Sequence, residues 1–103
     1  MASIYNLYGI KELPIEESVR HVKAKIGGAF SEHESSYKGV YFRAVIEDCE
    51  VTIEHNSTDD EGYRAEPNHT EYEILVYLNE ASELIVEELA DCEEITLLRS
   101  ELI

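Results

Sequence analysis

The chain has 103 residues, and its 23 aspartates and glutamates against 8 lysines and arginines give a formal net charge of −15. This length predicts a single domain, residues 1–103, with one core, and an apolar fraction of 44% argues against a disordered chain. Nucleic acids and anionic membranes bind proteins through lysine and arginine, so the charge argues against both as partners. It attracts basic partners instead; a purely solubilising role for the acids is the alternative.

The start of the chain carries no recognisable targeting or membrane signal. Its first eight residues lack the basic end and apolar run of a secretory signal, and no stretch has the ~20 apolar residues of a membrane span. We therefore expect a cytoplasmic protein. In that compartment Cys49 and Cys92 would be reduced thiols.

The first predicted element is a helix over residues 14–26. Pro14 suits the first helical position, and Gly27 with Gly28 suits the end. An apolar stripe at spacings of four, three and four residues predicts the buried side: Ile15, Val19, Val22 and Ile26.

Strands are predicted after this helix, first over residues 30–35 and then over residues 40–46. Glu47 and Asp48 are expected to turn the chain. Cys49, Val51, Ile53 and His55 alternate with Glu50, Thr52 and Glu54, which is typical of a half-buried strand with an acidic outer face and makes Cys49 a buried structural thiol. Residues 56–70 have almost no apolar content and are expected to form a long loop.

The last part of the chain predicts a strand over residues 71–78, a helix from about residue 80 to 91 and a strand over residues 95–98. Asn79 is the expected cap of this helix, and its expected core side chains are Ala81, Leu84, Ile85 and Leu89. The order of elements predicts an α+β fold, in which two helices pack on a mainly antiparallel sheet of four to five strands.

The acids are unevenly distributed along the sequence and include pairs that oppose stability. Residues 1–43 carry six basic and five acidic groups, whereas residues 44–103 carry two basic and 18 acidic groups. On the second helix Glu87 lies four residues from both Glu83 and Asp91, a spacing that is unfavourable for like charges. If the two strands around the long loop pair, Glu54 would face Glu71 or Glu73 across the ladder. A basic partner would relieve this repulsion on binding.

No catalytic or metal-binding pattern emerges from the residue spacing. The four histidines, at positions 21, 33, 55 and 69, lack the close pairing of zinc sites, and Asp59-Asp60-Glu61-Gly62 lacks the ligand spacing of a calcium loop. We therefore expect no enzyme, no catalytic residue, no cofactor, no metal and no small-molecule substrate. A small enzyme or sensor built around His55 and the cysteines is a third, weaker hypothesis.

Partner binding is the remaining class of function, and the long loop with its flanks is the candidate surface. Tyrosines in this acidic region are suitable interface anchors. The predicted partner-binding residues are Glu54, Asp59, Asp60, Glu61, Tyr63, Glu66, Glu71, Tyr72 and Glu73.

The chain resembles the small acidic immunity proteins of bacterial contact-dependent growth inhibition systems. The resemblance is in size, charge and element order, and it is carried by the acidic strand positions Glu50, Glu54, Glu71 and Glu73 and by residues 59–63. It implies a non-enzymatic inhibitor that forms a heterodimer with a basic toxin, with a nuclease, and first a ribonuclease, as its target. The inhibitor would cover the cationic active site with its acidic surface. The alternative is an acidic adaptor or regulatory subunit for another basic cellular protein.

Overall fold

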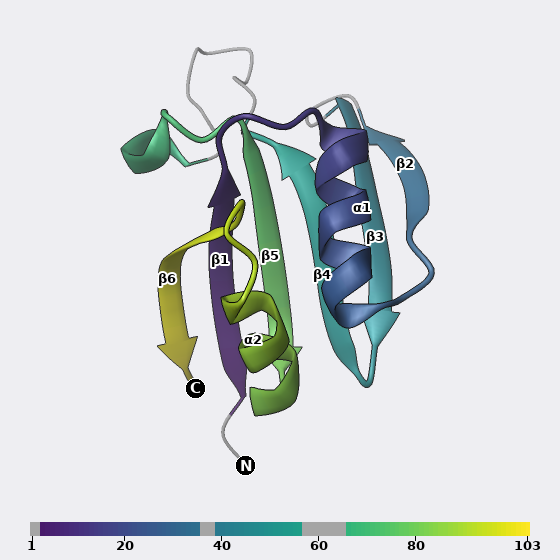
Figure 1. Ribbon diagram of the computed structural model, residues 1–103, viewed down its shortest axis with the longest axis vertical. Coiled ribbons are helices and arrows are strands. Elements are labelled where there is room, and N and C mark those ends of the chain that lie inside the picture. The colour runs from purple at the N-terminus through teal and green to yellow at the C-terminus, as the bar shows by residue number, and fades with distance from the viewer. Residues whose placement is uncertain (1–2, 36–38, 57–65) are drawn as a thin grey trace.

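Two amphipathic helices lie on one face of an antiparallel sheet in the computed structural model, which describes residues 3–35, 39–56 and 66–103 (Figure 1). The elements are β1 (Ile4–Ile10), α1 (Ile15–Ile26), β2 (Ser31–Ser35), β3 (Gly39–Ile46), β4 (Cys49–His55), the 3-10 helix η1 (Pro67–His69), β5 (Ile74–Ala81), α2 (Glu83–Ala90) and β6 (Thr96–Leu102). The six strands have the order β2-β3-β4-β5-β1-β6. The α+β class, the two helices and the antiparallel pairing are confirmed, but the sheet has six strands instead of four or five.

The strand that the sequence did not reveal is β1, which lies between β5 and the edge strand β6. Tyr8 and Ile10 belong to the core beneath the helices, whereas Leu7, only 1% exposed, is buried on the opposite face. A strand that is covered on both faces does not alternate between apolar and polar residues. The usual sequence signal of a half-buried strand is therefore missing here.

The core lies between the sheet and the helices and is built from alternate residues of the central strands. One side of each helix completes it. Both cysteines are free thiols, as expected, and Cys49 is buried as predicted; Cys92 is buried as well. Its main members are Tyr8, Ile10, Val22, Cys49, Val51, Ile53, Ile74, Val76, Leu78, Ile85, Leu89 and Cys92.

Helix α1 ends where its sequence predicts and begins one residue later than predicted, at Ile15. Pro14 is the N-terminal cap residue, and Gly27 ends the helix with φ of 74°, a backbone angle that favours glycine. Acidic residues occupy the first turn and basic residues the last turn, so both complement the helix dipole. The apolar stripe of the sequence is the side that faces the sheet.

Helix α2 is shorter than predicted because β5 extends to Ala81. Ser82, not Asn79, caps the helix, and its hydroxyl accepts a hydrogen bond from the backbone N–H of Ile85 at 3.3 Å. Ile85 and Leu89 are buried as expected, but the expected core position of Leu84 is wrong, because its side chain is 65% exposed. Of the helices in residues 3–35, 39–56 and 66–103, none is long and apolar enough to cross a membrane.

The predicted pairing of the two strands around the long loop is confirmed, but its register differs. Strands β4 and β5 are antiparallel neighbours, and Glu54 lies opposite Leu75. Glu71 and Glu73 precede β5, so the expected like-charge pairing of Glu54 with either of them is wrong. The repulsion expected across this ladder is therefore absent at Glu54.

The turn between β3 and β4 forms where the sequence predicts it. Ile46 and Cys49 pair across the two-residue connection, and Glu47 and Asp48 have φ of 49° and 68°. Positive φ at both central residues is the geometry that matches the twist of a two-residue hairpin.

Candidate functional site

Three connections meet at the end of the sheet that is uppermost in Figure 1. They are the link from β1 to α1, the segment before β5 and the turn between α2 and β6. They enclose a cavity of about 430 Å³, which we call the loop-end groove. Its lining residues are Ile10, Lys11, Glu12, Leu13, Tyr72, Glu93, Glu94 and Thr96.

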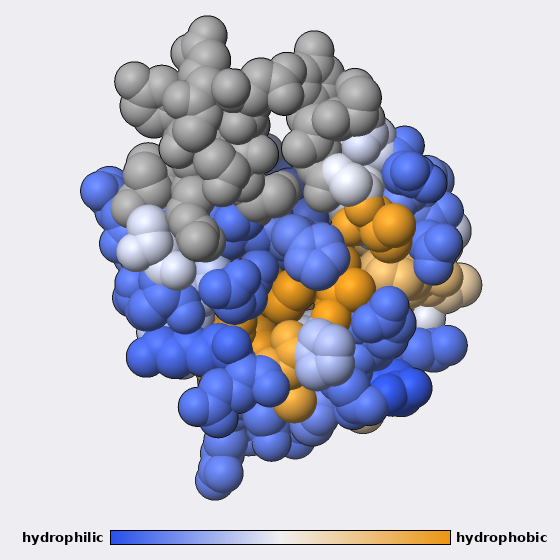
Figure 2. Space-filling view, turned by 90° about the horizontal axis from the view of Figure 1, so that it is seen from above, coloured by the Kyte–Doolittle hydropathy of each residue, from blue (hydrophilic) through white to orange (hydrophobic). Residues whose placement is uncertain are grey.

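The loop-end groove has an apolar base and a largely acidic margin. Ile10 and Tyr72 are almost completely buried, and Leu13 packs against the core. Glu12 and Glu93 are exposed at the margin. Figure 2 looks onto this end and shows apolar side chains lying between hydrophilic ones. Such a site suits a ligand with an aliphatic stem and a cationic head.

The position of Tyr72 in this groove depends on a glycine in β1. A Cβ atom on Gly9 would lie 2.5 Å from the Cγ and Cδ1 atoms of the Tyr72 ring, which is closer than atoms pack in proteins. The bare backbone of Gly9 therefore lets the ring lie directly on the sheet. The Nζ atom of Lys11 lies 5.1 Å from the centre of the same ring, a cation–π distance.

The segment before β5 is held against the sheet by the buried side chain of Asn56. The Oδ1 atom of Asn56 accepts a hydrogen bond from the N–H of Glu66 at 3.0 Å. Its Nδ2 donates to the carbonyl oxygens of Glu66, His69 and Tyr72 at 3.3, 3.1 and 3.1 Å. One side chain thus determines the path of the chain from Glu66 to Tyr72.

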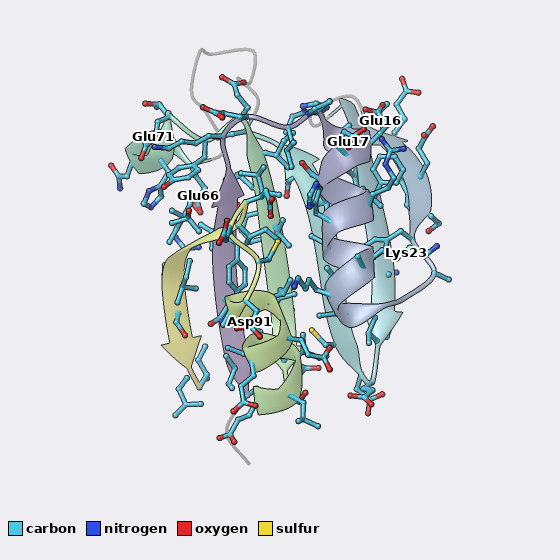
Figure 3. All side chains as sticks on the ribbon, viewed as in Figure 1. Glu16, Glu17, Lys23, Glu66, Glu71 and Asp91 are labelled. Atoms are coloured by element: carbon cyan, nitrogen blue, oxygen red, sulfur yellow. The ribbon has the colours of Figure 1, made fainter. Side chains whose placement is uncertain are left out.

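A charged cluster joins this segment to the face of the sheet that the helices leave uncovered. The carboxylate of Glu66 forms an ion pair with Arg99 at 3.2 Å and accepts a hydrogen bond from the Tyr77 hydroxyl at 3.4 Å. Burial, together with the negative charges of Glu66 and Glu54, raises the pKa of the Tyr77 hydroxyl. Figure 3 shows Glu66 and Glu71 together on the side of η1.

The predicted partner-binding residues differ in how far they reach the surface. Glu71 and Glu73 are exposed beside the groove residue Tyr72. Glu54 and Tyr72 are buried, with 6% and 9% exposure, and only 15% of the Glu66 side chain is exposed. Four predicted residues lie outside the described residues: Asp59, Asp60, Glu61 and Tyr63.

Carboxylates are not confined to the loop end. In the described part of the chain, acids also lie at the opposite end of the sheet, in the turn between β3 and β4 and at the start of α2. The loop end is distinguished by the apolar groove between its acids rather than by their number.

The predicted site did not include the groove residues of the link from β1 to α1 or of the turn between α2 and β6. Glu12, Glu93 and Glu94 lie far from the long loop in sequence and come close to Tyr72 only in the fold. The acidic run from Asp91 to Glu94 was the available signal.

Comparisons of the chain with family models, curated proteins and solved structures gave no match.

Proposed function

We propose that the chain is an immunity protein that binds a cognate cationic toxin domain and neutralises it. The toxin would be a nuclease, in the first place a ribonuclease, and the loop end would cover its active site. The observation that carries this proposal is the loop-end groove, whose apolar base lies beneath the exposed carboxylates of Glu12 and Glu93. No catalysis by the chain itself is required.

The groove matches the side chains that a nuclease uses to hold its substrate. A nuclease binds the phosphate backbone with lysine and arginine. The aliphatic stem of such a side chain would pack on Leu13, beside the Tyr72 ring that Lys11 covers, and its cationic head would reach the carboxylates at the margin. Occupation of these groups by the immunity protein would exclude RNA from the toxin.

The net charge of −15 acts at longer range, before contact is made. Complementary charge raises the association rate of two proteins, and salt reduces this effect. Buried anchors such as the ring of a tyrosine chiefly affect dissociation. The proposal therefore separates a salt-dependent association step from a packing-dependent dissociation step.

The test uses the C-terminal domain encoded by the gene immediately upstream, co-expressed with this chain. The complex should co-purify, and the chain should block RNA cleavage by that domain. In the loop-end variant E12Q/E71Q/E93Q, association at low salt should slow about tenfold. The control E83Q/E87Q/E88Q removes the same number of charges from exposed positions of α2 and should slow association less than about threefold.

These experiments test the immunity function and the loop end as its binding surface separately. Absence of binding and of inhibition would contradict the immunity function. Inhibition that is weakened equally by both variants would support the function and reject the loop end as its site. Stable association with a basic protein that has no toxic activity would favour the alternative, an acidic adaptor or regulatory subunit.

A further inference from the structure

Three side chains of the types that bind transition metals meet where α1 passes the turn between α2 and β6. His21 comes from α1, and Cys92 and Glu94 come from the turn. The Sγ atom of Cys92 lies 3.3 Å from Oε2 of Glu94, and Nδ1 of His21 lies 3.7 Å from the same oxygen. All three potential ligand atoms lie within 4.8 Å of one another.

The two separations that involve Glu94 are close to those of ligands around a tetrahedral zinc ion. Zinc binds sulfur at about 2.3 Å and nitrogen or oxygen at about 2.0–2.2 Å, which places neighbouring ligand atoms roughly 3.3–3.6 Å apart. The two measured distances from Oε2 of Glu94 fall near this range. A shift of about 1 Å in the His21 side chain would bring its nitrogen to the required distance from sulfur.

The donor set favours zinc over the common hard cations. Calcium and magnesium select oxygen ligands, whereas a site that combines imidazole, thiolate and carboxylate suits Zn²⁺. Within the described residues this group of three includes both a histidine and a cysteine. A surface patch of aspartates and glutamates alone would offer neither an imidazole nor a thiolate.

The three side chains combine a buried sulfur with two ligands that solvent can reach. Cys92 is only 4% exposed, whereas the side chains of His21 and Glu94 are 35% and 44% exposed. An ion can thus enter from solvent on the side of His21 and Glu94 and reach the buried sulfur, with a water molecule as its fourth ligand. The thiol of Cys92 donates a hydrogen bond to Glu94, and on metal binding the thiol would release this proton to the buffer.

We propose that His21, Cys92 and Glu94 form a zinc site that clamps α1 to the turn between α2 and β6. The ion would join two segments that are otherwise linked by packing and by the contacts of Glu94. It would also offset negative charge in the acidic run from Asp91 to Glu94. The zinc site shares Glu94 with the lining of the loop-end groove, but its test does not depend on the proposed immunity function.

The test is metal binding by the untagged full chain, measured with Zn²⁺ against a chelator and with Co²⁺ by absorption spectroscopy. We expect one zinc per chain with micromolar or tighter affinity, and a cobalt spectrum with tetrahedral bands and a thiolate charge-transfer band. The C92S variant should lose that band. H21Q and E94Q should each weaken zinc binding at least about tenfold.

Matched controls separate this site from general attraction of cations to an acidic protein. E93Q removes the neighbouring carboxylate, and H33Q removes an exposed histidine of β2; each should change the affinity less than about threefold. Zinc should raise the unfolding midpoint of the native chain but not that of E94Q. Because Cys92 is buried and C92S could unfold, the partly exposed H21Q and E94Q variants provide the decisive comparison. Absence of micromolar binding, or equal binding by E94Q and E93Q, would overturn the proposal.

Discussion

Replacement of Asn56 by alanine tests whether one side chain holds the segment before β5 against the sheet. In the native structure this side chain accepts one hydrogen bond from Glu66 and donates to three carbonyl oxygens. Asn56 is 3% exposed, so water does not readily replace those bonds. The variant N56A removes four hydrogen bonds to backbone groups of the segment, one of them buried and three partly buried.

The expected loss of stability follows from the number of bonds. A net hydrogen bond contributes about 0.5–1.5 kcal/mol, and an amide NH₂ has two hydrogens to share among the three carbonyls. The loss of two donated hydrogen bonds and one accepted hydrogen bond in N56A should therefore lower the free energy of unfolding by about 2–4 kcal/mol. This is a large part of a typical stability of about 5–15 kcal/mol.

The assay is equilibrium unfolding in urea, combined with hydrogen exchange of the Glu66 amide, which donates to Asn56 in the native chain. N56A should lower the free energy of unfolding by the amount given above and should speed exchange at Glu66. N68A is the control, because Asn68 is exposed in the same segment. A loss below about 1 kcal/mol for N56A, with unchanged exchange at Glu66, would refute the assigned role of this side chain.

Three further outcomes are expected from packing and titration. The variant G9A forces the Tyr72 ring off the sheet, since a Cβ at this position would lie 2.5 Å from that ring; urea unfolding should show a loss of about 1–3 kcal/mol. L89A should cost about 2–5 kcal/mol in the same assay because Leu89 is buried, whereas L84A should cost less than about 1 kcal/mol because Leu84 is exposed. Burial raises the pKa of the Cys49 thiol from 9.0 to about 11; between these values the unfolded chain loses this proton first, so stability should fall as pH rises above 9. Thermal unfolding from pH 8 to 10.5 checks this, and a midpoint that does not fall would contradict it.

Local sequence patterns were sufficient for the elements whose two sides differ. The apolar stripe of α1 with its terminal proline and glycines indicates one buried and one exposed side, as the structure has them. The alternation of residues 49–55 correctly indicates strand β4, but its half-buried character is wrong, because Thr52 and Glu54 on the second side are only 8% and 6% exposed. The turn at Glu47 and Asp48 was predicted from the polar residues between two strands, and the structure has it there. These elements could be identified because their signals lie within a few neighbouring residues.

The boundaries around the long loop were less well predicted. Alternation of apolar residues from Tyr72 to Leu78 indicated a strand, but hydrogen bonds to β4 and β1 place β5 over Ile74–Ala81. This extension delays the start of α2 to Glu83. Strand pairing, rather than local propensity, decided where the strand ended and the helix began.

The sequence by itself determined the acidic charge, the α+β class, helix α1 and the hairpin of β3 and β4. Only the tertiary structure decided that β1 lies between β5 and β6, that Glu12 and Glu93 border the same groove as Tyr72, and that His21 lies beside Cys92 and Glu94. The reason is physical: periodicity records which side of an element is buried, whereas contacts between distant segments depend on strand order and on the packing of the whole chain.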